Sequence, residues 1–297
     1  MTGRWNGRRP AGRVAYVNGR YLRHGDAGVH VEDRGLQLGD AVYEVCRIDN
    51  GHLLDEEEHL DRLERSLREI EMAMPMRRGA LKLVMAEIVR RNGVRDGLLY
   101  LQVTRGALKR DHPIPANPPK PTLIVTARGM DEAALARRRA GGVAVFTCPD
   151  ERWARCDVKT TQLLANLLAK TAARRAGAFE AWLVDDDGFV TEGASTTAWI
   201  VDRDGHVVTR DLSHAILPGV TRRVILEAAA EAQIPVVERR FTLAEALSAR
   251  EAFMSSATGA AIPVISIDGT KVGDGVPGPM ARRIGELYTK RSQERLS

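Results

Sequence analysis

Two segments of the chain contain side chains suited to binding a carbonyl compound with a pyridine ring. Lys159 lies in segment 156–161, between a predicted strand and a predicted helix. A lysine forms a Schiff base only when it is deprotonated, and burial favours that state. Glu192 follows a predicted strand and precedes a glycine turn, and a single carboxylate is the partner that a protonated pyridine nitrogen needs. A surface lysine and a turn carboxylate are the simpler interpretations of each residue alone.

A third segment, 217–222, places a glycine turn directly before a helix with apolar periodicity. The first N–H groups of a helix have no partner within it, so Val220 and the Thr221 hydroxyl suit a phosphate. Arg62 could complete such an anion site. A plain helix N-terminus explains the segment equally well.

A fourth segment opens a proline-rich loop with Arg110, Asp111 and His112. Two potential cations at this spacing could bind a substrate carboxylate, the arginine through two hydrogen bonds. Solvated loop charge is the alternative interpretation.

Several common catalytic signatures are absent from the sequence. The chain has no GxGxxG, P-loop, HExxH or GxSxG motif, and segment 185–188 lacks the ligand spacing of a calcium loop. Cys46, Cys148 and Cys156 form no CxxC pair, which indicates reduced thiols in a cytosolic chain. We therefore expect no metal site and no hydride, phosphoryl or zinc chemistry.

The net charge of +5 first suggests a nucleic-acid partner, but its distribution argues otherwise. Residues 1–24 hold six arginines and no acidic residue, which leaves 38 basic and 39 acidic side chains in the remaining chain. No apolar run approaches the ~18 residues of a membrane-spanning helix, and no signal peptide follows the basic start. We expect a cytoplasmic protein with no nucleic-acid or membrane partner.

The elements that must position these groups mix strands and helices without βαβ alternation, which predicts an α+β fold. Asn18-Gly19 and Asn50-Gly51 predict hairpin turns, and Asp55 predicts a helix N-cap. Further strands are expected at 98–103, 122–126, 143–147, 181–208 as a meander, 252–256 and 263–267. Further helices are expected at 78–92, 161–176, 219–232, 242–249 and 278–293.

The length of the chain predicts two domains. We expect a disordered basic extension over 1–13 and a small N-terminal α+β domain over 14–130. A polar, arginine-rich linker follows at 131–139, and a larger C-terminal α+β domain with Lys159 covers 140–297.

Six segments, in this order, resemble the class IV (fold type IV) pyridoxal-phosphate aminotransferases. The segments are 33–44, 58–63, 102–106, 157–160, 191–193 and 219–222. The resemblance runs from about Tyr16 to the C-terminus and is greatest to the D-amino acid branch of the family. It implies a homodimer that transfers the amino group of a D-amino acid, such as D-alanine, to 2-oxoglutarate by a ping-pong mechanism.

The resemblance also implies roles for individual residues. Lys159 would form the Schiff base with pyridoxal 5'-phosphate, and Glu192 would pair with its pyridine nitrogen. The phosphate would be held by Arg62, Val220, Thr221, Ala257 and Thr258. The substrate carboxylate would be bound by Tyr43, Arg110 and His112, the loop with the last two coming from the partner subunit.

Two departures and two alternatives accompany the resemblance. Thr197 stands where the family usually has Asn, which affects support around the pyridine-nitrogen site, and Ala257 replaces a hydroxyl residue that contacts phosphate. A branched-chain or R-selective amine transaminase, or an aminodeoxychorismate lyase, is the alternative within the family. A non-catalytic basic binding protein is the alternative outside it.

Overall fold

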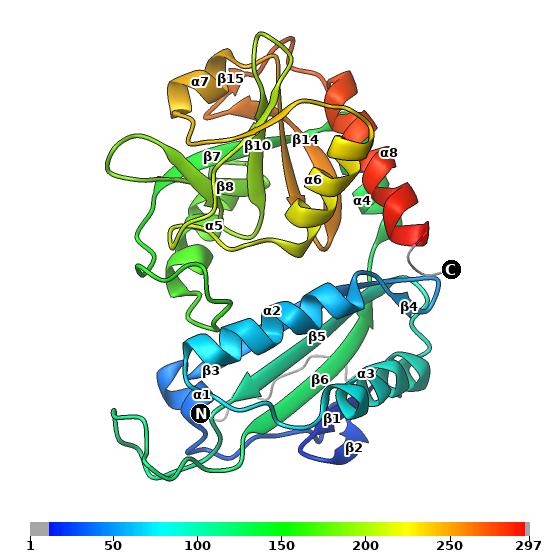
Figure 1. Ribbon diagram of the computed structural model, residues 1–297, viewed down its shortest axis with the longest axis vertical. Helices are drawn as coiled ribbons and strands as arrows, with labels where there is room; N and C mark the ends of the chain where they lie inside the picture. The colour runs from blue at the N-terminus through cyan, green and yellow to red at the C-terminus, as the bar shows by residue number, and fades with distance from the viewer. Residues whose placement is uncertain (1–11, 295–297) are drawn as a thin grey trace, which may run out of the picture. The chain divides into compact units, whose positions relative to one another are not determined.

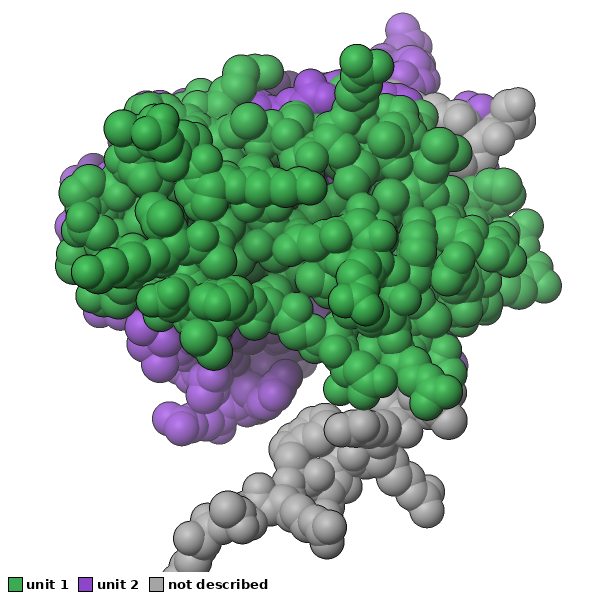
Figure 2. Space-filling view, turned by 90° about the horizontal axis from the view of Figure 1, so that it is seen from below, with its two compact units in different colours: residues 1–53, 67–130 green, residues 54–66, 131–297 purple. Residues whose placement is uncertain are grey.

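The computed structural model describes residues 12–294 (Figure 1). The basic extension expected over 1–13 lies outside the described residues except for residues 12 and 13, and the first strand begins at Val14. Contacts divide the chain into two compact units (Figure 2). Unit 1 comprises Met1–Leu53 and Leu67–Met130, and unit 2 comprises Leu54–Ser66 and Asp131–Ser297.

Unit 1 is built on a six-stranded antiparallel sheet with the order β2-β1-β6-β5-β3-β4. The strands are β1 (Val14–Val17), β2 (Arg20–Arg23), β3 (Ala41–Asp49), β4 (His52–Leu53), β5 (Gly97–Thr104) and β6 (Thr122–Gly129). Both predicted Asn-Gly turns are confirmed, because Asn18, Gly19, Asn50 and Gly51 all have positive φ. Such turns match the twist of the flanking strands and fix their register.

Helix α3 (Arg78–Asn92) covers this sheet by packing against β1 and β6. Its buried residues Leu81, Met85 and Ile88 recur at helical spacing, which is why the sequence predicted its bounds correctly. A short helix, α1 (Arg34–Leu38), was not predicted. Helix α2 (Glu56–Glu69) begins in unit 2 and ends in unit 1.

Unit 2 contains a nine-stranded mixed sheet with the order β12-β11-β10-β13-β14-β7-β8-β9, and β15 pairs with β14. The strands are β7 (Val143–Pro149), β8 (Glu180–Val184), β9 (Val190–Gly193), β10 (Thr197–Val201), β11 (Val207–Thr209), β12 (Val236–Glu238), β13 (Glu251–Ser256), β14 (Gly259–Ile267) and β15 (Thr270–Lys271). Parallel and antiparallel pairs occur together in this sheet. The predicted α+β class is confirmed.

Helices cover the sheet of unit 2 and complete its core. They are α4 (Glu132–Gly141), α5 (Leu164–Arg175), α6 (Val220–Glu231), α7 (Leu243–Ser248) and α8 (Pro279–Glu294). Helices α6 and α8 pack together over β13 and β14 (Figure 1), around the stacked cross-strand pair Trp199 and Phe253. Helix α5 packs its alanines against β7 and β8.

The proposed linker at 131–139 needs correction, because most of it is helical. The Asp131 side chain accepts a hydrogen bond from the Ala134 N–H and caps α4. Alanine and arginine favour the helix, so the polar composition reflects an exposed helix face instead of an irregular linker. Residues 54–66, which the sequence grouped with the N-terminal domain, belong to unit 2.

Candidate active site

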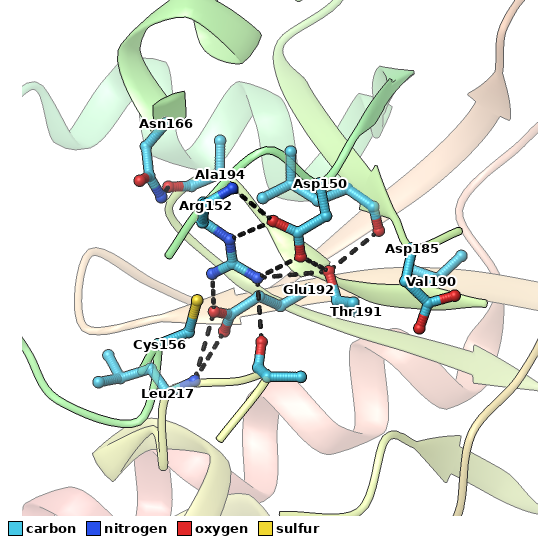
Figure 3. Close-up of polar contacts among 12 residues, drawn as sticks. Asp150, Arg152, Cys156, Asn166, Asp185, Val190, Thr191, Glu192, Ala194 and Leu217 are labelled. Atoms are coloured by element: carbon cyan, nitrogen blue, oxygen red, sulfur yellow. Dashed lines mark hydrogen bonds and ion pairs between the residues drawn. The ribbon is translucent and has the colours of Figure 1, made fainter. Parts of the chain in front are cut away.

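Glu192 lies in β9 at the centre of a buried polar network in unit 2 (Figure 3). The Arg152 guanidinium donates a hydrogen bond to the Glu192 carboxylate, and the two form an ion pair. The Leu217 backbone N–H lies 3.3 Å from both carboxylate oxygens. Glu192 is therefore held between a cation and the residue that opens the Gly219 turn.

Arg152 is itself held by a second carboxylate. Asp150 accepts from Arg152 Nε at 2.8 Å and from Nη2 at 2.7 Å, a bidentate pair. Thr191 Oγ1 donates to Asp150 at 2.7 Å, and the Ala215 carbonyl accepts from Arg152 at 3.0 Å. Every side of the guanidinium thus has an acceptor, as Figure 3 shows.

Burial and charge act in opposite directions on this network. Burial raises the pKa of Glu192, and Arg152 opposes that rise. Burial would also raise the pKa of Asp150, but the hydrogen bonds and charge of Arg152 bring it below its usual value. Burial raises the pKa of the nearby Cys156 thiol to about 11, so the thiol is protonated at neutral pH.

Lys159 is half-buried in the segment between β7 and α5. Asp157, two residues before Lys159, fixes the conformation of this loop. Arg155 donates to both Asp157 carboxylate oxygens at 3.0 and 3.1 Å, and Arg65 donates to the Asp157 carbonyl. The Lys159 backbone N–H donates to Ser66 Oγ at 3.4 Å. The lysine therefore stands on a loop that charged hydrogen bonds hold in one conformation.

The first part of α2, which belongs to unit 2, faces both the Lys159 loop and the Gly219 turn. Arg62 donates to the Pro218 carbonyl at 3.2 Å, and Arg65 and Ser66 contact the Lys159 loop. Residues three and four apart on a helix share one face, so this spacing brings all three to the same side. The structure thus places Arg62 beside the predicted phosphate turn.

The Gly219 turn leads into α6 as the sequence predicted. Gly219 is the N-cap and offers no side-chain hydrogen bond, so the first N–H groups of this twelve-residue helix point outward from its start. A Cβ at Gly219 would lie 3.2 Å from Thr197 Oγ1. Thr197 on β10 pairs with Ser255 on β13. Residues 257–258 directly follow β13, so they belong to the same region as the Gly219 turn.

Thr258 and Ala257 form the turn between β13 and β14. The hydroxyls of Thr258 and Ser256 lie 3.0 Å apart, so Ser256 places a second hydroxyl beside that of Thr258. Thr197, which the resemblance places where the family usually has Asn, lies against Gly219.

The residues present fit pyridoxal phosphate by their donor set and charge. With both carboxyls ionised, Asp150, Arg152 and Glu192 together carry one net negative charge, the complement of one protonated ring nitrogen. The Thr196 hydroxyl oxygen is buried and has no hydrogen-bond partner within residues 12–294. A buried polar atom of this kind needs a partner, which a bound polar ligand can supply.

The three residues predicted to bind a carboxylate all belong to unit 1. Tyr43 is half-buried on β3, where its ring stacks on that of Tyr100 at a centroid distance of 5.7 Å. The pKa of Tyr100 is raised to about 12, mainly by burial and to a smaller extent by the neighbouring Tyr43. Arg110 and His112 are exposed on the loop between β5 and β6.

Sequence reasoning missed the residues that hold the candidate catalytic groups in place. Arg152, Arg65, Ser66 and Arg155 lie beside Glu192 or the Lys159 loop, yet none stands in a motif. The one available signal was the Asp150-x-Arg152 spacing, three residues after the strand predicted over 143–147. That signal is common on protein surfaces and does not identify a buried pair.

Comparison with known proteins places this site in a family. The Amino-transferase class IV family model matches residues 41–267. Solved branched-chain amino acid aminotransferases share the fold: the Escherichia coli enzyme is 27% identical with a TM-score of 0.84, covering 94% of each chain. The enzyme of the archaeon Thermoproteus uzoniensis, solved with norvaline, is 26% identical with a TM-score of 0.82, also covering 94% of each chain.

The fold and site therefore define a pyridoxal-phosphate-dependent aminotransferase. The chain belongs to the class IV aminotransferase family, as its sequence predicted. Among its relatives, the D-alanine aminotransferase of Bacillus licheniformis is 40% identical over 90% of this chain and 93% of the relative. The D-alanine aminotransferase of Staphylococcus haemolyticus is 35% identical over 95% of this chain and 99% of the relative. Family membership excludes a non-catalytic binding protein.

Every helix within residues 12–294 is too short or too polar to cross a lipid bilayer.

Proposed function

We propose that this aminotransferase transfers the amino group of a D-amino acid, such as D-alanine, to 2-oxoglutarate in two successive half-reactions. The observation that carries the proposal is the buried Asp150–Arg152–Glu192 network beside the Lys159 loop and the start of α6. Relatives of 35 to 40% identity that are D-alanine aminotransferases support the substrate class.

The residues of unit 2 act on the cofactor. When bound, pyridoxal phosphate withdraws electrons from the substrate Cα and so makes its proton removable. The Lys159 amine holds the cofactor and then moves the proton at that carbon. Glu192 keeps the ring nitrogen protonated by pairing with its N–H.

A second set of residues would hold the phosphate. Helix N-termini bind anions through free N–H groups, which Val220 and Thr221 supply at the start of α6. Arg62 adds a positive charge beside the turn, where its guanidinium already contacts Pro218. The Ala257 N–H and the Thr258 hydroxyl complete the set from the β13–β14 turn.

Unit 1 supplies the carboxylate site of the substrate. Arg110 binds the carboxylate through two hydrogen bonds, with His112 and Tyr43 as further donors. Because Arg110 and His112 are exposed in the single chain, they suit contact with the site of a second subunit.

The protein acts as a homodimer in the cytoplasm. Leu164, Leu167 and Leu168 lie on one face of α5 with exposed fractions of 70, 60 and 59%. Three adjacent exposed leucines favour burial against a second copy. Within residues 12–294, Cys46, Cys148 and Cys156 form no disulfide, which suits a reducing compartment.

A branched-chain substrate is the second candidate, because solved branched-chain aminotransferases share the fold. Purified enzyme assayed with D-alanine, L-leucine and (R)-1-phenylethylamine, each with 2-oxoglutarate, separates the candidates. We expect turnover chiefly of D-alanine, and Arg110→Ala should impair the two substrates that carry a carboxylate. Preference for L-leucine would refute the D-amino acid assignment.

The role of Lys159 is tested by Lys159→Ala. We expect a protein that loses the yellow absorbance of the lysine-bound cofactor together with its turnover. Lys290→Ala is the control, since the Lys290 side chain on α8 is 75% exposed and lies outside the proposed site. Turnover by Lys159→Ala at the wild-type rate would contradict the proposal.

A further inference from the structure

A buried arginine in unit 1 connects the start of α1 to the loop that carries Arg110 and His112. Arg34 is 3% exposed. Its Nη1 donates to the Asp111 carbonyl at 2.6 Å, and its Nη2 lies 3.3 Å from the His112 carbonyl. The loop is thus held through its backbone at the two residues that follow Arg110.

Arg34 also holds the beginning of this loop. Its backbone N–H donates to the Gly106 carbonyl at 3.0 Å. Gly106 has a φ of +99°, and a Cβ there would lie 2.3 Å from the Lys120 carbonyl oxygen, so the two ends of the loop meet at this residue. One arginine therefore contacts both the closed base of the loop and its functional segment.

The guanidinium of Arg34 cannot easily change direction. Asp40 Oδ2 accepts from Arg34 Nε at 2.8 Å and from Arg105 Nε at 2.7 Å. At the start of α1, Asp33 accepts from the Gly35 N–H at 2.8 Å and from the Thr104 hydroxyl at 3.0 Å. Arg34 is thereby fixed at both its backbone and its side chain.

We propose that Arg34 is a positioning residue that sets the place of Arg110 and His112, and through them the affinity for the substrate carboxylate. The inference rests on the proposed function of those two residues. An arginine is required because its planar fork reaches one carboxylate and two carbonyls at once, whereas a lysine presents a single ammonium.

The test compares Arg34→Lys with Arg105→Lys in the holoenzyme. Arg105 shares Asp40 and is equally buried, but its other donors go to the Ile70 and Glu71 carbonyls, away from the loop. We expect Arg34→Lys to raise KM for D-alanine about tenfold, the effect of one charge-assisted hydrogen bond, with little change in kcat. Amide exchange over 107–114 should accelerate in Arg34→Lys and stay unchanged in Arg105→Lys.

A double variant separates positioning from general damage. If Arg34 acts through Arg110 and His112, adding Arg34→Lys to the variant Arg110→Ala with His112→Ala should leave its KM unchanged. The positioning role is overturned if Arg34→Lys raises KM further in the combined variant. It is also overturned if amide exchange over 107–114 is unchanged in Arg34→Lys. An unchanged KM in Arg110→Ala would instead overturn the carboxylate site and this inference with it. Should Arg34→Lys fold poorly, Arg34→Gln carries the same readouts.

Discussion

Replacing Arg152 by methionine should destabilise unit 2 severely. The change leaves Asp150 and Glu192 buried, with side-chain exposures of only 11 and 9%, and without their shared cation. Removing one partner of a buried ion pair costs about 3–5 kcal/mol, because a charge remains uncompensated in a medium that solvates it poorly. For a unit of this size, that loss corresponds to a fall in Tm of about 10 °C.

The matched control is Arg155→Met. Arg155 also pairs with an aspartate in the same segment, but its side chain is 34% exposed and water can replace it. An ion pair of this kind contributes about 0–1 kcal/mol. Trp182 and Trp199 are buried in unit 2, so fluorescence during urea unfolding at pH 7 follows this unit in both variants.

The pH dependence of Arg152→Met checks the cause of the loss. Without the cation, burial raises the folded-state pKa of both carboxyls above the unfolded value. Folding then takes up protons, so the variant should regain stability as the pH falls from 7 toward 5. The reasoning is refuted if Arg152→Met costs under about 1 kcal/mol, as expected for Arg155→Met, or if its deficit is the same at both pH values.

Three further predictions concern single residues. Burial would raise the pKa of Asp40, but Arg105 and Arg34 hold it below its usual value, so the stability it contributes is lost as the pH falls below about 4. Asp40→Asn should therefore flatten the decline of Tm between about pH 5 and 3, and an unchanged slope would contradict this. The Cys156 pKa of about 11 should make its alkylation at pH 8 about a hundredfold slower than that of a free cysteine, measured by mass spectrometry. Gly35→Ala should cost about 1–3 kcal/mol in urea unfolding, because its Cβ would lie 2.4 Å from Thr104 Cγ2. Gly79→Ala, with open space around its Cβ, should cause no such loss.

The distinction between fold and substrate follows from where the groups lie. Branched-chain enzymes share the whole fold at 26 to 27% identity, while the relatives of 35 to 40% identity are D-alanine aminotransferases. Glu192 stands on β9 and the Gly219 turn leads into α6, whereas Arg110 and His112 stand on the loop between β5 and β6. Loops change without altering the scaffold, so the fold alone does not select a substrate.

The amino-acid sequence by itself determined the elements whose signals are local. Asn-Gly pairs set the hairpin turns, and apolar spacing set α3 and α6 within about a residue of their bounds. These signals act between residues at most four apart, so they are visible in the chain before it folds. The linker predicted over 131–139 was wrong. An exposed, arginine-rich helix such as α4 has the composition of a linker, and the Asp131 N-cap was not recognised in the sequence.

The motifs also led to the family, since Lys159, Glu192 and the Gly219 turn keep their chemical types in a characteristic order. Only the tertiary structure decided what holds them. Arg152 meets Glu192 across 40 positions, Ser66 meets the Lys159 N–H across 93, and Arg34 meets the Asp111 carbonyl across 77. The packing of sheets and helices determines such partners. The sequence does not distinguish an arginine buried against a carboxylate from one exposed to solvent.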